Sequence, residues 1–156
     1  MKKNKCKKCK KQIHRDEVHE YNVGYFHPHC YETYKKVKLR AEADKAWQMA
    51  TEEMYGDECE MRGTGEEAET CSGIAYCSHH FFYKGNFEQT RYTRENAVRV
   101  CSACHTKWHY NDPKLMNKAI EDKRGKEWYD NLLIEARKPT PQTSIAYYER
   151  KIEELT

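Results

Sequence analysis

The chain has 156 residues, of which 34% are charged and only 38% are hydrophobic. This length allows one domain of catalytic size or two very small ones, and this polarity excludes a large apolar core, so bound metals or other cross-links are expected. No run approaches the ~18 apolar residues of a membrane span, and the lysine-rich start lacks the apolar segment of a secretory signal. We therefore expect a soluble, cytoplasmic protein with no membrane partner.

The charge is unevenly distributed, although the net charge is only +3. Seven lysines fall within the first eleven residues, whereas residues 52–69 carry eight acidic side chains and one arginine. A basic arm permits binding to phosphates, but it is equally typical of a solvated surface. Charge alone therefore does not identify a nucleic-acid partner.

The first third of the chain is predicted to form a cysteine-rich segment followed by a long helix. Residues 5–30 contain Gly24 beside two aromatic residues, which favours short strands or turns. Residues 31–55 contain no Gly or Pro, and Gly56 is expected to end the helix there. Spacings of four, three and four place one apolar face on Ala43, Trp47, Ala50 and Met54.

The remaining elements alternate between loops, short strands and helices. Between residues 57 and 100 we expect a loop over 57–72, a strand over 74–78, a turn at 85–86 and a brief apolar run over 97–100. Downstream we expect four helices. The first carries His105 and His109, and the second starts at Asp112-Pro113 and extends to about 122. The third covers 126–137 and is ended by the prolines that follow, and the fourth covers about 142–155.

The first metal-ligand pattern is Cys6-x2-Cys9-x17-His27-x2-Cys30. Two thiolates two residues apart form a knuckle, and a second pair completes a tetrahedral shell around Zn²⁺. His29 is an alternative to His27, but it is adjacent to Cys30 and would break the knuckle spacing. A closed four-ligand site is structural, and its thiolates must stay reduced, which favours an intracellular compartment.

A second zinc site is predicted from Cys101-x2-Cys104, which needs two further ligands. Cys59 and Cys71 lie upstream and complete an all-cysteine shell, although the 11 residues between them are an unusual spacing. Cys77 could replace Cys71. Because it lies beside a histidine pair in the expected strand, we interpret Cys77 as a buried free thiol.

The third pattern is His79-His80, Asn96 and His105-x3-His109. Histidines four residues apart lie on one helical face and can share a metal. Adjacent histidines on a strand point to opposite sides, so one can bind a metal while the other acts as a base. Asn96 would hold the loop or orient that base. Such a set can hydrolyse phosphodiesters with a divalent cation, Mg²⁺, Mn²⁺, Ni²⁺ or Zn²⁺.

The segment that carries this pattern, CSHHFFYKGNFEQTRYTRENAVRVCSACHTKWH, resembles the ββα-metal core of the HNH (His-Me finger) endonucleases. The resemblance implies that His80 is the general base, Asn96 the central asparagine, and His79, His105 and His109 the catalytic metal ligands. The Cys101 and Cys104 pair is similar to that of zinc-stabilised members. Many members have Asp or Gly at the position of His79, which leaves the third ligand open, and many keep only the histidine that follows the cysteine pair.

A narrower resemblance covers most of the chain and points to phage recombination endonucleases of the NinG (Rap) type. It rests on the spacing from His80 to Cys101 and on the ending IEDKRGKEWYDNLL…YYERKIEEL. The chain departs from that pattern in its shorter linker helix, its stretched upstream cysteine pair and the histidine at position 79. The resemblance implies a phage-encoded enzyme, located in the bacterial host cell, that cleaves branched or single-stranded recombination intermediates.

The fold predicted from these patterns is α+β. It consists of an N-terminal zinc finger over residues 1–30, a connecting helix over 31–56, a zinc-stabilised ββα-metal core over 57–111 and a C-terminal helical extension over 112–156. The expected partner is DNA, and symmetric cleavage of a junction would favour a homodimer. Phosphate contacts are predicted for four basic residues around the core: Arg91, Arg94, Arg99 and Lys107. The alternatives are a catalytically inactive zinc-finger DNA-binding or adaptor protein and a structural interaction module.

Overall fold

The computed structural model of the chain describes residues 5–13, 19–21 and 24–156. Residues 1–4, which carry the first two lysines of the basic run, lie outside this description. Within it the chain is a mixed α+β protein with five α-helices and two small antiparallel sheets, so the predicted fold class is confirmed at that level. The chain divides into two units, 1–43 with 143–154 and 44–142 with 155–156.

The first unit contains a small hairpin, formed by β1 (His19–Tyr21) and β2 (Gly24–Phe26). Gly24, the first residue of β2, has a φ of +122°, a conformation that residues with a side chain rarely adopt, so glycine suits this position. The predicted short strands are therefore found. The last helix, α5 (Ile145–Leu155), begins three residues later than predicted and lies in this unit through residue 154.

The long helix α1 spans Pro28–Tyr55, close to the predicted range. Gly56 ends it with a φ of +73°, and its N–H donates to the carbonyl of Glu52 at 2.8 Å. Trp47 is 1% exposed as predicted, but Met54 is 48% exposed, so its assignment to the apolar face is wrong. The hydroxyl of Thr51 contacts the neighbouring strand, so the buried face turns toward Thr51 and away from Met54.

The second unit is built on a two-stranded hairpin of β3 (Cys77–His80) and β4 (Ala97–Val100). The strands are antiparallel, with His79 opposite Val98 and His80 opposite Ala97. The first strand was predicted over 74–78, and it begins three residues later and ends two residues later. Ile74 is 67% exposed and forms only an isolated bridge with Glu58, because the cysteine-containing loop occupies this stretch.

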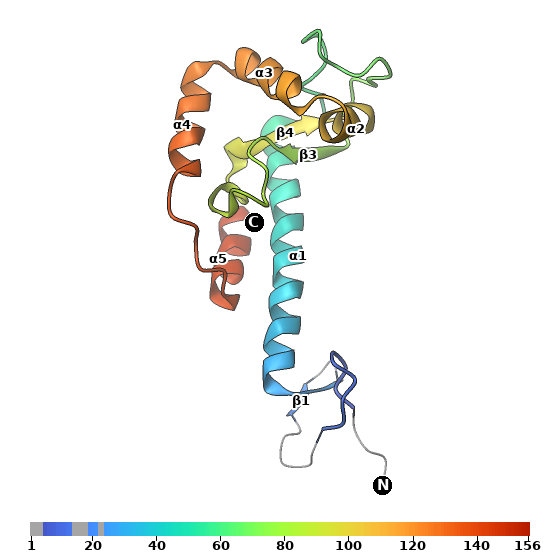
Figure 1. Cartoon of the computed structure of the whole chain (residues 1–156), viewed down its shortest axis with the longest axis vertical. Coiled ribbons are helices and arrows are strands. Elements are labelled where there is room, and N and C mark those ends of the chain that lie inside the picture. Colours follow the sequence, from blue (N-terminus) through green and yellow to red (C-terminus); the bar gives the residue numbers. More distant parts are fainter. Residues whose placement is uncertain (1–4, 14–18, 22–23) are drawn as a thin grey trace. The chain divides into compact units, whose positions relative to one another are not determined.

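Three helices follow the hairpin: α2 (Ser102–Tyr110), α3 (Pro113–Arg124) and α4 (Lys126–Ala136). Figure 1 shows that β4 leads directly into α2, which lies at that end of the hairpin. Helices α3 and α4 follow α2 in turn. The Asp112 carboxylate accepts from the N–H of Leu115, with Pro113 at the first helical position, so this predicted helix start is confirmed.

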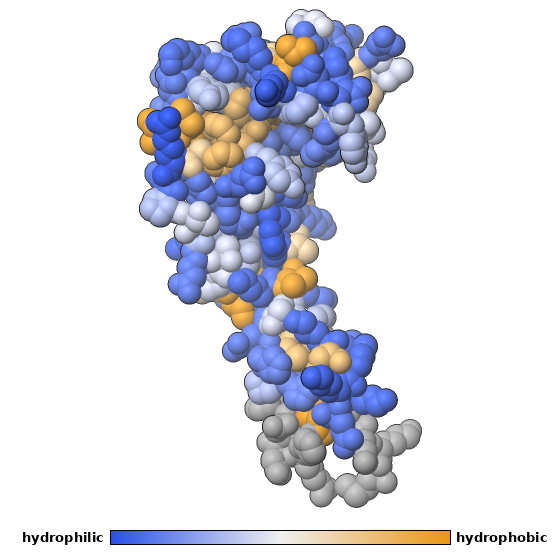
Figure 2. Space-filling view, viewed as in Figure 1, coloured by the Kyte–Doolittle hydropathy of each residue, from blue (hydrophilic) through white to orange (hydrophobic). Residues whose placement is uncertain are grey.

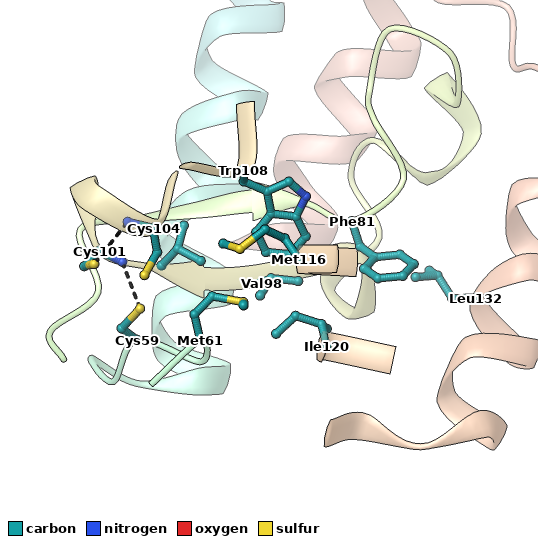
Figure 3. Close-up of a cluster of buried hydrophobic side chains, with 11 residues drawn as sticks. Cys59, Met61, Phe81, Val98, Cys101, Cys104, Trp108, Met116, Ile120 and Leu132 are labelled. Carbon is teal, nitrogen blue, oxygen red and sulfur yellow. Dashed lines mark hydrogen bonds between the residues drawn. The ribbon is translucent and has the colours of Figure 1, made fainter. Parts of the chain in front are cut away.

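The core of the second unit lies between the hairpin and these helices. In Figure 3, Val98, Trp108 and Met116 form its centre, with cysteines at one end and Leu132 at the other. The face shown in Figure 2 is mostly hydrophilic, in keeping with the mean hydropathy of −1.13. A core this small needs further stabilisation, and the cysteines that border it are placed to supply it. No helix in the described ranges is long and apolar enough to cross a membrane.

Candidate metal centres

Among the residues that the structure describes, three clusters of cysteine and histidine side chains bring their donor atoms within 4.8 Å of one another. They match the three patterns predicted from the sequence. The clusters are Cys6, Cys9, His27 and Cys30; Cys59, Cys71, Cys101 and Cys104; and His79, His105 and His109. The first belongs to one unit and the other two belong to the second unit.

The four-cysteine cluster has the dimensions of a tetrahedral zinc site. The Sγ atoms of Cys71 and Cys101 are 3.8 Å apart, and Zn–S bonds of ~2.3 Å give a tetrahedral edge of about 3.8 Å. Backbone N–H groups donate to three of the sulfurs. The N–H of Cys101 donates to Cys59 at 3.3 Å, that of Cys104 to Cys101 at 3.4 Å (both in Figure 3), and that of Ala68 to Cys104 at 3.4 Å. Cys71 rather than Cys77 completes the cluster, so the donor set fits a closed structural Zn²⁺.

The thiols of this cluster differ in how readily they ionise. Burial raises the pKa of Cys59, and burial together with the neighbouring sulfurs raises the pKa of Cys104. Burial also opposes ionisation of Cys101, but N–H donors including that of Cys104 outweigh it and lower the pKa to about 6. Such crowding of potential thiolates is unfavourable without a cation, and a dication at the centre removes the repulsion.

The N-terminal cluster also fits zinc. The Sγ of Cys9 lies 3.6 Å from Nδ1 of His27, and typical Zn–S and Zn–N bonds predict about 3.6 Å for a tetrahedral pair. The Nε2 atom of the alternative ligand, His29, lies 3.3 Å from the Sγ of Cys30. The four donors that come together are nevertheless the three cysteines and His27. Burial opposes ionisation of Cys6, yet backbone N–H donors lower its pKa to about 5. This thiol is therefore suited to bind a metal as thiolate.

The histidine cluster is assembled from the hairpin and the helix that follows it. His79 lies on β3, and His105 and His109 lie one turn apart on α2 with their Nε2 atoms 3.2 Å apart. Two Zn–N bonds of ~2.05 Å at a tetrahedral angle give about 3.3 Å. The ring of Trp108 packs against that of His79, with the two centroids 4.4 Å apart. Three nitrogen donors leave a coordination position open, as catalytic sites require.

Two histidines of this cluster are held neutral by their surroundings. Burial lowers the pKa of His79 to about 3, and the nearby His105 and His109 act in the same direction. Burial and His109 also lower the pKa of His105. Because a metal binds the unprotonated imidazole, these residues are available as ligands at neutral pH.

His80 points to the opposite side of β3 from His79. Its ring stacks on that of Trp47 with centroids 3.9 Å apart, and its Nε2 lies 2.9 Å from the carbonyl oxygen of Arg91. A carbonyl only accepts, so Nε2 carries the proton and Nδ1 is left as an acceptor. Burial lowers the pKa of His80 to about 4, which keeps the ring neutral at pH 7. The ring is thus fixed in one orientation, and no hydrogen bond to its Nδ1 is found among the described residues.

Asn96 holds the loop between the two strands. Its Oδ1 accepts from the N–H of Phe82 at 2.7 Å, and its Nδ2 donates to the carbonyls of Phe82 and Thr90, each at 3.1 Å. The side chain is fully buried. Of the two roles predicted for Asn96, these contacts support holding the loop, and no hydrogen bond to His80 is found among the described residues.

We expect Asn96→Ala to lower the free energy of unfolding by about 3 kcal/mol, because buried backbone groups of the loop lose their partners. Urea unfolding of the zinc-loaded chain measures this. Asn131→Ala, at an exposed site on α4, is the matched control and should change stability by no more than ~0.5 kcal/mol. Equal destabilisation by the two substitutions would contradict the role assigned to Asn96.

The residues that anchor β3 to α1 carry no local signal in the sequence. The amide of Gln48 pairs with the backbone of Ser78, donating to its carbonyl at 2.9 Å and accepting from its N–H at 2.8 Å. The hydroxyls of Thr51 and Ser78 lie 2.7 Å apart. The side-chain amide of Gln48 thus forms the two hydrogen bonds that a neighbouring strand would form with Ser78. This contact fixes β3, the strand that carries His79 and His80.

Two of the predicted phosphate contacts need correction. Arg91 and Arg99 are each 3% exposed. Arg91 pairs with Asp44 through two hydrogen bonds of 2.9 and 2.6 Å, and Arg99 donates to the carbonyl of Gly56 at 3.1 Å. Their guanidinium groups stabilise the fold and are not accessible to a phosphate. Lys107 donates to the carbonyls of Glu66 and Glu67, and Arg94 remains exposed.

The three histidines and His80 line one cavity of about 300 Å³. Lys84, which sequence reasoning missed, lies in the same lining, and its charge contributes to the lowered pKa values of His79, His80 and His105. None of the described residues that line this cavity is acidic, although the chain has 25 acidic residues. The cavity therefore suits an anionic ligand.

Removal of one histidine should remove one metal ion. We expect the full chain dialysed against micromolar Zn²⁺ to hold three ions, His105→Ala to hold two and His80→Ala to retain three, because His80 lies outside the cluster. Elemental analysis after dialysis measures this. Equal zinc content in the parent and His105→Ala would rule out the histidine centre.

Comparisons with protein-family models, with curated proteins and with solved structures found no match to this chain.

Proposed function

We propose that the chain is a metal-dependent endonuclease of the HNH type that hydrolyses DNA phosphodiester bonds. The observation that carries the proposal is one cavity that combines a three-histidine cluster with an oriented, neutral fourth histidine. A purely structural metal site would need a fourth ligand and no free base. The hairpin, the loop held by Asn96 and the helix α2 support the predicted likeness to a ββα-metal core.

The donor set favours a particular kind of metal. His79, His105 and His109 would hold the ion through three imidazole nitrogens, and none of the described cavity-lining residues offers a carboxylate. Imidazole suits Zn²⁺ and Ni²⁺, whereas Mg²⁺ prefers oxygen ligands. Of the four ions expected from the sequence, we therefore propose Zn²⁺ or Ni²⁺ for catalysis, with two further zinc ions in the cysteine-containing sites.

In the proposed reaction, His80 accepts a proton at Nδ1 from the attacking water. The water oxygen forms a bond to phosphorus, and the bond from phosphorus to the leaving oxygen breaks, with the leaving oxygen keeping the electron pair and taking a proton from solvent water. The hydrogen bond from Nε2 to the carbonyl of Arg91 and the stack on Trp47 keep the ring in place and stabilise the protonated form that results. When bound, the divalent cation supplies charge neutralisation at the phosphate oxygens. Arg91 itself is held by Asp44, so the carbonyl that orients His80 is fixed.

The resemblance to the NinG type adds a substrate to this proposal, namely branched or single-stranded recombination intermediates. Cleavage assays on duplex, single-stranded and four-way-junction DNA, with Mg²⁺, Mn²⁺, Ni²⁺ and Zn²⁺ in turn, test it. We expect cleavage with at least one of Zn²⁺ and Ni²⁺. Retention of DNA with no cleavage under any metal would instead favour the zinc-dependent DNA-binding or adaptor protein.

A further inference from the structure

Two exposed tyrosines line the histidine cavity. Tyr76 precedes β3 and is 78% exposed, and Tyr83 follows the same strand and is 55% exposed. Scattered exposed aromatic residues are common, but here both belong to the lining of one cavity beside four histidines. A planar aromatic ring that is exposed to solvent at the edge of a ligand cavity is suited to stack on a planar part of a ligand.

Tyr83 is held in position by the turn that follows it. Its carbonyl accepts from the N–H groups of Asn86 at 3.0 Å and Phe87 at 3.1 Å. Its ring lies over Gly85, where an added Cβ would come within 2.5 Å of Cε1. The ring therefore lies against a stretch of backbone that lacks a Cβ, and a methyl group added there would displace it.

The charge beside these rings is positive. Lys84 adjoins Tyr83 and lines the cavity, and none of the described residues of this lining is acidic. A dication held by the three histidines would increase the positive potential. A ligand that fits both features carries phosphate next to flat, apolar rings, which describes a nucleotide whose base is not paired.

We propose that Tyr76 and Tyr83 stack on unpaired bases next to the scissile phosphate, which Lys84 contacts, so that the site selects single-stranded DNA over uninterrupted duplex. The proposal rests on the proposed nuclease function of the same site. In a duplex the faces of the bases are covered by their neighbours, and side chains reach those faces only where the strand is open.

Binding of fluorescent oligonucleotides to the full, zinc-loaded chain tests this, with His80→Ala in every protein to prevent turnover. A single strand and the matching duplex are compared by anisotropy. We expect the single strand to bind more tightly. Tyr76→Leu with Tyr83→Leu should weaken single-strand binding roughly tenfold or more, whereas Tyr76→Phe with Tyr83→Phe, which keeps both rings, should stay within about twofold.

Gly85→Ala is a further variant that removes no aromatic group. Because its Cβ displaces the ring of Tyr83, single-strand affinity should fall while zinc content is retained. The stacking proposal is overturned if the Leu pair binds the single strand as tightly as the parent, if the Phe pair loses as much as the Leu pair, or if the parent shows no preference for single strands. Absence of cleavage by the chain with His80 intact would refute the hydrolase alone and leave this binding comparison valid.

Discussion

Replacing His80 with alanine should lower the rate of DNA cleavage at least about a hundredfold, since general-base catalysis contributes typically 10²–10⁴-fold. The ring is neutral, its Nε2 donates to the carbonyl of Arg91, and Nδ1 alone can accept a proton. No other histidine in the cavity lining lies outside the metal-binding cluster, among the residues described. Single-turnover cleavage of labelled DNA with saturating Zn²⁺ or Ni²⁺ is the measurement.

A second variant separates loss of the base from loss of the fold. His80 packs on Trp47, so alanine leaves a cavity beside that ring. His80→Asn fills part of the space and can still donate to Arg91, but it cannot take up a proton at neutral pH. We expect both variants to keep the parent's circular dichroism spectrum and zinc content and to lose activity alike. Cleavage by His80→Asn at the parent's rate would remove His80 from the mechanism.

The metal clusters were predictable because their signals are local. The spacing of Cys101 and Cys104 defines a knuckle, and the four-residue interval from His105 to His109 defines one face of a helix. Alternation of side chains along a strand separated the roles of His79 and His80, and the resemblance to the HNH endonucleases assigned His79 to the metal. The spacing within each pair depends on a few neighbouring residues, whereas Cys59, Cys71 and His79 were added as the remaining donors of a suitable type.

The supports of the site could not be predicted, since they join residues far apart in the chain. Gln48 contacts Ser78 thirty residues later, and Arg91 pairs with Asp44 across 47 positions. An arginine whose partner is unknown resembles a surface charge, which explains the incorrect phosphate assignment of Arg91 and Arg99. Tyr83 and Lys84 were missed for a related reason: only the fold brings the turn at Gly85 to the histidines.

Replacing Cys71 with serine should prevent stable folding of residues 44–142. Structural zinc contributes about 10–16 kcal/mol of apparent binding free energy in zinc-finger peptides, as much as the whole free energy of unfolding of an ordinary domain. The cluster closes one end of the small core, where Cys59, Cys101 and Cys104 pack with Met61. Loss of one ligand opens the shell and leaves the remaining thiols crowded without full neutralisation.

Cys77→Ser is the matched control, because Cys77 is also half-buried and lies outside the cluster. Burial raises the pKa of Cys77, so its thiol is uncharged at neutral pH and needs no metal. We expect Cys77→Ser to cost about 1 kcal/mol or less and to leave the zinc content unchanged. Thermal unfolding followed by circular dichroism, together with zinc analysis, measures both variants. If Cys77→Ser unfolds the domain and Cys71→Ser does not, Cys77 is the fourth ligand and the loop that carries Cys71 must be placed differently.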